Sequence, residues 1–165
     1  MSYWKPRAGL EYYAVVRSLL ESLGPLGSLA DIGSWDTPVA TWGDFDQRYT
    51  VDHRERPALS SVRQIVGSWP DCAALLPLCD VVTCLQVLEH LDEPKPFCAA
   101  LFAAARHAVI VSVPWMWPAG NEPGHRQDPV DGEKLVAWTH RKPTLQRIVG
   151  KPARAVLLYH ITAPS

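Results

Sequence analysis

The chain has 165 residues, a length that fits one domain with a single core. Hydrophobic residues make up 47% and charged residues 20%, a composition typical of soluble globular proteins that excludes disordered and collagen-like chains. The 16 Lys and Arg balance 17 Asp and Glu, and no basic run is present that would follow a phosphate backbone. We therefore expect no nucleic-acid partner.

The sequence predicts a cytoplasmic protein that contacts no membrane. No apolar stretch follows the basic residues of the N-terminus, and none reaches the roughly 18 residues that a membrane helix needs. The four cysteines are Cys72, Cys79, Cys84 and Cys98, and no two of them form a C-x-x-C pair. We therefore expect buried free thiols rather than a disulfide framework or a bound metal.

The apolar spacing predicts alternating helices and strands. Residues 12–23 carry apolar side chains at helical intervals, and Gly24-Pro25 ends that helix. Residues 96–106 form the clearest later helix, whereas the crossover at 34–47 leaves room for only a short one. Six short apolar runs are predicted as strands, at 28–32, 48–52, 64–67, 80–86, 108–113 and 154–161.

Several of these runs are nearly continuous, as in Val109-Ile110-Val111, which is typical of strands covered on both faces. The sequence thus predicts an α/β fold, a doubly wound, mostly parallel sheet of about six strands with flanking helices. Residues 114–131 contain four prolines and two glycines, so they are predicted as a long loop after the fifth strand. Loops of this length are often lids or binding loops.

Acidic residues stand at the ends of the first two predicted strands. Ligands of open α/β sheets bind outside the carboxyl ends of the strands. Asp31 and Gly33 close the first strand, and Asp52 ends the second about twenty residues later, where a carboxylate can bind a ribose diol. This spacing favours an adenosine-containing cofactor, while a solvated strand-end carboxylate is the alternative for Asp52.

The fourth predicted strand continues into Val87-Leu88-Glu89-His90-Leu91-Asp92-Glu93-Pro94. With the two strand ends, this segment resembles the class I S-adenosylmethionine (SAM)-dependent methyltransferases, especially the group that acts on small molecules. The resemblance covers about residues 28–114. It implies a Rossmann-like fold, SAM as cofactor and methyl transfer as the reaction.

The resemblance also implies roles for individual residues. Asp31, Gly33 and Ser34 would hold the methionine part of the cofactor, together with Leu85 and Gln86. The ribose hydroxyls would bind Asp52, and the neighbouring His53 is a further candidate for binding the cofactor. The adenine would stack on Trp69, with Ser68 or Asp71 as its polar partner. In the N-terminal arm, Arg7 would pair with the cofactor carboxylate and a tyrosine would cover the sulfonium, although simple packing of the arm on the sheet is an equal alternative.

Two departures from the family pattern are visible. The second and third glycines of the first motif are missing, because Gly33 is followed by Ser34-Trp35-Asp36-Thr37-Pro38. The same stretch lacks the G-x-G-x-x-G that a nicotinamide-dependent oxidoreductase would need. After 108–113 only one further strand is predicted where the family has two, so a compact member with a trimmed sheet is expected.

Methyl transfer needs orientation of the acceptor and exclusion of water, and a general base helps when the acceptor carries a proton. The candidates for that base are His125, Asp128 and His90. For His90 a structural role in the turn is the alternative, and for His125 an ordinary exposed loop position.

The leading hypothesis is a SAM-dependent methyltransferase of a small-molecule or glycan-type acceptor, and the alternative is a catalytically silent binding or scaffold domain. One domain is expected, with an N-terminal helical arm (1–24), a cofactor-binding core (28–113), a lid or acceptor loop (114–131) and a C-terminal helix and last strand (132–165). Trp42 and Trp138 fit ordinary packing. The other four tryptophans follow predicted strand ends and should gather at the ligand edge of the sheet: Trp35, Trp69, Trp115 and Trp117.

Overall fold

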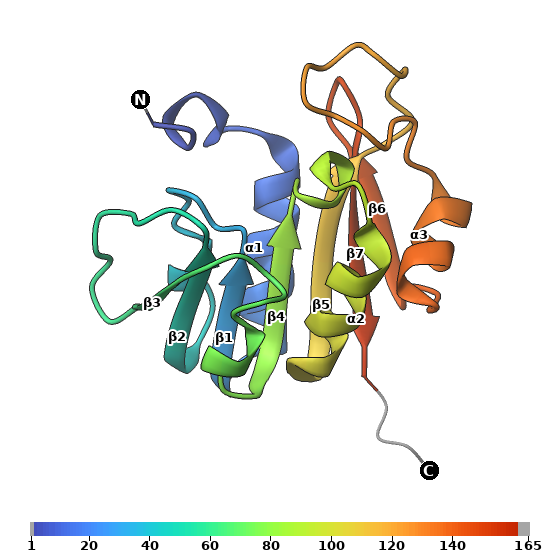
Figure 1. The fold of residues 1–165 in the computed structure, drawn as a ribbon. Helices are drawn as coiled ribbons and strands as arrows, with labels where there is room; N and C mark the ends of the chain where they lie inside the picture. The colour runs from blue at the N-terminus through green and yellow to red at the C-terminus, as the bar shows by residue number, and fades with distance from the viewer. Residues whose placement is uncertain (1, 162–165) are drawn as a thin grey trace.

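The structure, a computed structural model, describes residues 2–161 and contains a seven-stranded sheet with helices on both faces (Figure 1). The strand order is β3-β2-β1-β4-β5-β7-β6. The first five strands are parallel, and β7 is antiparallel to both β5 and β6. The strands are β1 (Leu26–Ile32), β2 (Phe45–Asp52), β3 (Arg63–Val66), β4 (Cys79–Leu85), β5 (Ala105–Pro114), β6 (Leu145–Val149) and β7 (Arg154–His160).

Three α-helices flank the sheet, α1 (Glu11–Leu23), α2 (Pro94–Ala103) and α3 (Gly132–Thr139). Short 3-10 turns add η1 (Lys5–Arg7), η2 (Val39–Thr41), η3 (Ala73–Leu75) and η4 (Leu88–His90). The doubly wound α/β fold is therefore confirmed. In the 34–47 crossover the only helical structure is the η2 turn.

The prediction of a trimmed sheet is wrong, because β6 supplies a seventh strand at the edge. Its sequence, Leu-Gln-Arg-Ile-Val, places polar residues in the middle, and none of its five residues is buried. An edge strand needs only one neighbour and little burial, so the apolar pattern that reveals central strands is missing here. The predicted helix 96–106 also ends too late, since Ala105 already pairs with Cys79 as the start of β5.

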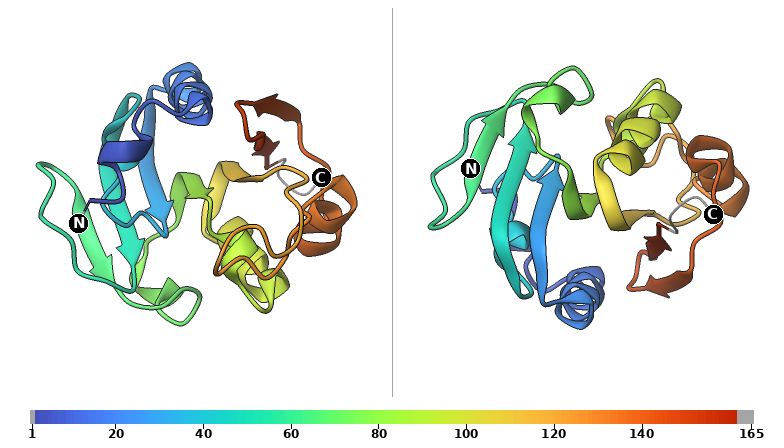
Figure 2. Two further views of the ribbon diagram at one scale, coloured as in Figure 1. Left: turned by 90° about the horizontal axis from the view of Figure 1, so that it is seen from above. Right: turned by 90° about the horizontal axis from the view of Figure 1, so that it is seen from below.

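The helices cover opposite faces of the sheet (Figure 2). On one face α1 buries Val16 and Leu20 against Leu29 and Ile110. On the other face α2 and α3 pack against each other and bury Leu101 and Leu135 in a second hydrophobic cluster. The central strands are covered on both sides, as their continuous apolar runs predict, and all four cysteines are buried free thiols.

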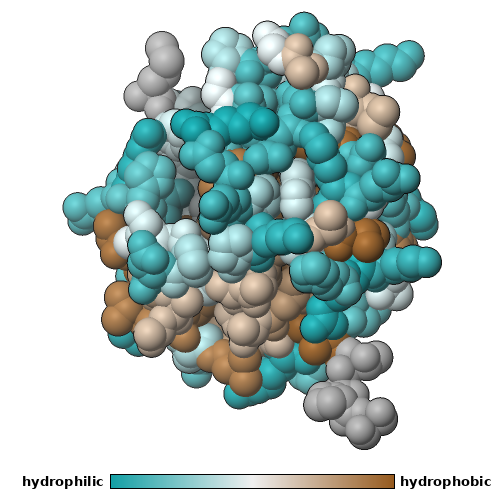
Figure 3. All heavy atoms as spheres, turned by 45° about the vertical axis from the view of Figure 1, so that its right-hand side comes forward, coloured by the Kyte–Doolittle hydropathy of each residue, from teal (hydrophilic) through white to brown (hydrophobic). Residues whose placement is uncertain are grey.

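The chain order reverses between the neighbouring strands β1 and β4. Such a switch point opens a crevice at the carboxyl ends of the strands. The N-terminal arm and loop 114–131 both lie over this edge of the sheet (Figure 1). Hydrophilic side chains cover most of the face drawn in Figure 3, with hydrophobic patches between them. Among residues 2–161, no helix has the length and apolar character needed to cross a membrane.

Candidate active site

A cavity of about 430 Å³ opens at the switch point between β1 and β4. This size suits a small organic ligand or cofactor. Nine of the residues singled out from the sequence line it: Asp31, Gly33, Asp52, His53, Ser68, Trp69, Leu85, Gln86 and His90. Eight of them come from the ends of β1, β2, β3 and β4, as the strand-end reasoning predicts, and His90 comes from η4.

Asp31 forms the buried floor of the cavity. Its carboxylate accepts hydrogen bonds from Thr83 Oγ1 at 2.6 Å and from Thr37 Oγ1 at 3.3 Å. Complete burial raises the pKa of Asp31 to about 7, although both hydroxyl donors act against the rise. A buried carboxyl of this kind favours a cationic group, such as the amino group of an amino acid, as its ligand.

The turn after β1 keeps one glycine for a clear steric reason. Gly33 has a φ of 74°, and a Cβ there would come within 2.6 Å of Val87 Cγ2. Trp35 takes a left-handed conformation without being glycine, with a φ of 42°. Its backbone N–H donates to Asp52 Oδ2 at 2.8 Å, so the turn is held against the end of β2.

Asp52 already has protein partners on both oxygens. Besides Trp35, the backbone N–H of Arg54 donates to Oδ1 at 3.0 Å, and His53 Nδ1 lies 3.2 Å from the same atom. A carboxylate can accept about four hydrogen bonds, so acceptor capacity is left for a ligand diol. Asp52 therefore both shapes the turn and faces the cavity.

The N-terminal arm closes one side of the cavity with aromatic rings. Ser2 Oγ and the backbone N–H groups of Tyr3 and Trp4 all donate to the carboxylate of Asp36, which ties the arm to the turn after β1. Tyr3 then stacks on Trp35, with ring centroids 5.3 Å apart. Tyr3 and Tyr13 both line the cavity.

Three residues predicted to bind the cofactor lie elsewhere in the structure. Arg7 stands behind Tyr3, with its guanidinium 4.1 Å from the ring centroid, and does not line the cavity. Ser34 is buried outside the lining, and no group among residues 2–161 hydrogen-bonds its Oγ. Asp71 is exposed, which leaves Ser68 as the polar group beside Trp69 in the lining.

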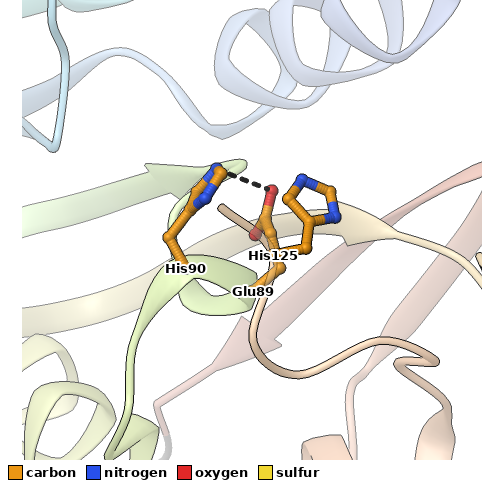
Figure 4. A group of neighbouring side chains, drawn as sticks. All are labelled: Glu89, His90 and His125. Carbon is orange, nitrogen blue, oxygen red and sulfur yellow. Dashed lines mark ion pairs between the residues drawn. The ribbon is translucent and has the colours of Figure 1, made fainter. Parts of the chain in front are cut away.

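A second group of side chains lies beside the cavity, where η4 meets loop 114–131. Glu89 is fully buried, and its backbone carbonyl accepts from the N–H groups of Arg126 at 2.7 Å and Gln127 at 3.2 Å. These bonds bring His125 next to His90, with ring centroids 4.8 Å apart. Figure 4 shows the Glu89 carboxylate between the two imidazole rings. We call Glu89, His90, His125 and Asp128 the rim cluster.

The rim cluster is fixed by further contacts. His125 Nδ1 lies 2.7 Å from Asp128 Oδ2, and the His125 ring stacks on Trp117 at 5.6 Å. His90 Nδ1 lies 3.0 Å from the carbonyl oxygen of Gly124. Burial raises the pKa of Glu89 to about 8, and the nearby Asp128 adds to the rise. His90 faces the cavity, while His125 and Asp128 stand behind it.

Sequence reasoning missed Glu89 as a site residue, although it stands in the quoted Glu-His motif. Its signal was an acidic residue directly after the apolar pair Val87-Leu88, which suits a buried functional carboxyl as well as a solvated turn. The four tryptophans expected at the ligand edge line two different pockets. Trp35 and Trp69 line the cavity, whereas Trp115 and Trp117 line a smaller pocket beside Pro118.

Comparison with known proteins gives similarity at the level of structure. No protein-family model and no curated protein matches the sequence. The magnesium protoporphyrin IX methyltransferase of Synechocystis PCC 6803, solved with bound S-adenosylhomocysteine (SAH), superposes with a TM-score of 0.63 at 17% identity, over 92% of this chain and 83% of that chain.

Two further solved structures are similar. The N-methyltransferase NodS from Bradyrhizobium japonicum WM9, also in complex with SAH, gives a TM-score of 0.70 at 10% identity, over 91% of this chain and 85% of that chain. A SAM-dependent methyltransferase from Aquifex aeolicus gives 0.64 at 14% identity, over 89% of each chain. The chain therefore has the fold of the class I SAM-dependent methyltransferases, and the resemblance seen in its strand-end residues is confirmed at the level of the fold.

Proposed function

We propose that the protein is a SAM-dependent methyltransferase that acts on a small-molecule or glycan-type acceptor. The cavity at the β1–β4 switch point carries this proposal. It gathers a buried carboxyl, a strand-end carboxylate and an indole ring in the order that SAM would need: Asp31, Asp52 and Trp69. Two of the similar structures hold SAH, which supports SAM as the cofactor.

In this proposal the cofactor extends across the carboxyl ends of the strands. The adenine stacks on Trp69, and the ribose hydroxyls donate to the free lone pairs of Asp52. The amino group of the methionine part pairs with Asp31, whose burial makes a cationic partner favourable. The sulfonium then lies near Tyr3 and Tyr13, whose ring faces attract a positive charge. Arg7 stays a proposed partner of the cofactor carboxylate, reached by turning away from Tyr3.

The reaction is a displacement at the methyl carbon. The acceptor atom forms a bond to this carbon as the carbon–sulfur bond breaks, and the sulfur leaves as the thioether of SAH. An acceptor hydroxyl or ammonium must also lose a proton. We assign this activation to the rim cluster, where His90 and His125 are the catalytic candidates and Asp128 orients His125.

A small acceptor fits the chain's charge balance, since the formal charge is -1 and no basic run is present to hold a nucleic acid. Loop 114–131, which contributes His125 and Trp117, is the proposed determinant of acceptor choice. The four buried free thiols favour a reducing compartment such as the cytoplasm.

Calorimetric titration with SAM and SAH tests the proposal. We expect both to bind, and Asp52→Asn to weaken SAH by about 1–3 kcal/mol, roughly 5- to 150-fold, because charge-assisted hydrogen bonds to the ribose are lost. The matched control is Asp46→Asn, at an exposed carboxylate on the same strand, which should leave the affinity unchanged.

Three outcomes would overturn parts of this assignment. If neither SAM nor SAH binds at about 1 mM, the proposal of a methyltransferase is contradicted, because a protein with so weak an affinity could not use SAM as its cofactor. Tight binding with no methyl transfer to any small-molecule or glycan acceptor in a mass-spectrometric screen would instead favour the silent binding domain. Equal SAH affinity in Asp52→Asn and the wild type would place the ribose elsewhere.

A further inference from the structure

Three of the four side chains of the rim cluster, those of Glu89, His90 and His125, face one another with electron-pair donor atoms, and no hydrogen bond joins any two of these three side chains. The ligand atoms of Glu89, His90 and His125 all lie within 4.8 Å of one another. His90 Nε2 lies 3.9 Å from Glu89 Oε1, too far for a hydrogen bond (Figure 4).

Hydrogen bonding fixes which nitrogen of each histidine carries the proton. His90 Nδ1 faces the carbonyl oxygen of Gly124, which can only accept, so this nitrogen must donate. His125 Nδ1 faces the Asp128 carboxylate at 2.7 Å, and the same reasoning applies. With the proton on Nδ1, both neutral rings keep a lone pair on Nε2. His90 Nε2 is the nitrogen nearest to Glu89 Oε1, and Figure 4 shows a ring nitrogen of His125 on the side of the same carboxylate.

Glu89 adds an unpaired acceptor. Its side chain is 1% exposed, and no group among residues 2–161 donates to its Oε2. A buried acceptor without a donor costs about 1–3 kcal/mol. Only a cation or an added proton can serve these acceptors together, because none of the three ligand atoms donates a hydrogen to another.

We propose that Glu89, His90 and His125 bind a divalent transition-metal ion, with zinc as the best fit. Two imidazole nitrogens and one carboxylate oxygen form a common ligand set for zinc sites that keep an open position. Imidazole favours zinc and cobalt, whereas magnesium prefers oxygen ligands. The Asp128 carboxylate behind His125 fixes the tautomer and orients the ring, as second carboxylates do at metal-bound histidines. This site replaces our expectation that the protein holds no metal.

The geometry needs only a small adjustment. Ligand atoms at about 2.0–2.1 Å from zinc lie about 3.4 Å apart in a tetrahedron. The present separations of up to 4.8 Å must therefore contract by about 1.4 Å at most, on this basis. The side chains of Glu89 and His125 are buried, whereas the side chain of His90 is 47% exposed, so a shift of His90 disturbs the packing least.

The site would explain how an acceptor is activated, and this consequence rests on the proposed methyltransferase function. His90 lines the cofactor cavity, so an open coordination position lies at its rim. A coordinated hydroxyl or carboxyl oxygen would be oriented toward the methyl carbon, and its pKa would fall. With both Nε2 lone pairs bound to the metal, the metal would activate the acceptor in place of the two histidines acting as bases. The proton would leave to solvent, the oxygen would take the methyl group, and the sulfur would depart as SAH. An oxygen acceptor is therefore expected.

Metal binding is tested on tag-free protein treated with a chelator and then titrated with zinc, cobalt or magnesium chloride. We expect one zinc or one cobalt ion per chain by calorimetry, visible absorption bands from bound cobalt, and much weaker binding of magnesium. Asp128→Asn should weaken zinc about 10- to 100-fold as a positioning residue. Glu89→Gln, His90→Ala and His125→Ala should weaken it further.

The control is His160→Ala, which removes an exposed histidine at the end of β7 and should leave the zinc affinity unchanged. His90 is half-exposed, so His90→Ala keeps the test decisive if a change at buried Glu89 disturbs folding. The proposal is overturned if zinc and cobalt fail to bind at about 1 mM, or if binding is the same in the His90 and His125 variants as in the wild type. SAH titration is independent, so metal binding without SAH binding would contradict the proposed function and leave the metal site standing.

Discussion

The two halves of the candidate site are built differently. The cofactor half comes from strand ends, where pairing with neighbouring strands fixes Asp31, Asp52 and Leu85. The rim cluster comes from η4 and loop 114–131, where side chains and single backbone contacts fix Glu89 and His125. The sheet thus fixes one half of the site, and local contacts fix the other.

Loop 114–131, which supplies His125, is held in place by several contacts with η4 and the residues after it. We predict a lid from its length and proline content, and its movement stays a prediction. The structure shows the loop tied to η4 by backbone bonds to Glu89, by Gln127 Nε2 donating to the Leu91 carbonyl at 2.7 Å, and by an ion pair between Arg126 and Asp92. Opening would have to break these contacts and would separate His125 from Glu89.

The largest expected effect tests whether stability lies in the sheet and its helices. Leu101 in α2 is fully buried, so Leu101→Ala should lower the free energy of unfolding by about 2–5 kcal/mol through lost burial and a new cavity. Leu75→Ala makes the same change at a side chain that is 64% exposed, and should change stability by no more than about 0.5 kcal/mol. Urea unfolding measures both. Similar losses in the two variants would contradict the assigned core.

The next effect concerns the pH dependence carried by Asp31. In the unfolded chain this carboxyl ionises near its ordinary pKa of 3.8, whereas in the folded protein it keeps its proton up to about pH 7. The native state therefore binds more protons between these values, and Asp31 lowers stability progressively as pH rises through this window. The penalty is absent below the window and constant above it.

Asp31→Asn should remove that pH dependence. Relative to the wild type, we expect the variant to gain up to about 4 kcal/mol of stability between pH 4 and pH 7, while binding SAH more weakly because the charge is gone. Urea unfolding across the pH range and calorimetry at pH 7 measure the two effects. A constant stability difference across pH would show that Asp31 is not the titrating group, and unchanged SAH affinity would remove it from the proposed cofactor site.

How much the sequence predicts follows the same division. Continuous apolar runs and acidic strand ends mark the central strands and place Asp31 and Asp52 at the edge where the cavity lies. Parallel neighbours bring their carboxyl ends together whatever the intervening chain does. The edge strand β6 could not be predicted from the sequence, because none of its residues is buried and it therefore lacks an apolar pattern.

The rim cluster could not be assembled from the sequence in the same way. Glu89 and His125 lie 36 positions apart by residue number, and their meeting depends on two backbone N–H groups that bond one carbonyl oxygen. The sequence does supply the histidine and its carboxylate as His125 and Asp128, because three positions within one loop suffice for contact. It does not show that Arg7 turns onto Tyr3 rather than toward the cavity.

The smallest expected effect acts on the rim cluster alone. Trp117 stacks on His125 and donates its Nε1 hydrogen to the Ala153 carbonyl at 2.7 Å, so it holds the loop against the chain before β7. Trp117→Leu should loosen this loop by about 0.5–1.5 kcal/mol, the usual contribution of an aromatic pair beyond its burial. Amide hydrogen exchange at Arg126 and Gln127, whose N–H groups bond Glu89, should then quicken by roughly 2- to 12-fold. Met116→Leu, at an exposed neighbour, should leave exchange unchanged.

The affinity for SAH should be equal in the wild type, Trp117→Leu and Met116→Leu, because strand ends hold the cofactor half of the site. A fall in SAH affinity comparable to that of Asp52→Asn would mean that the two halves are coupled through the loop.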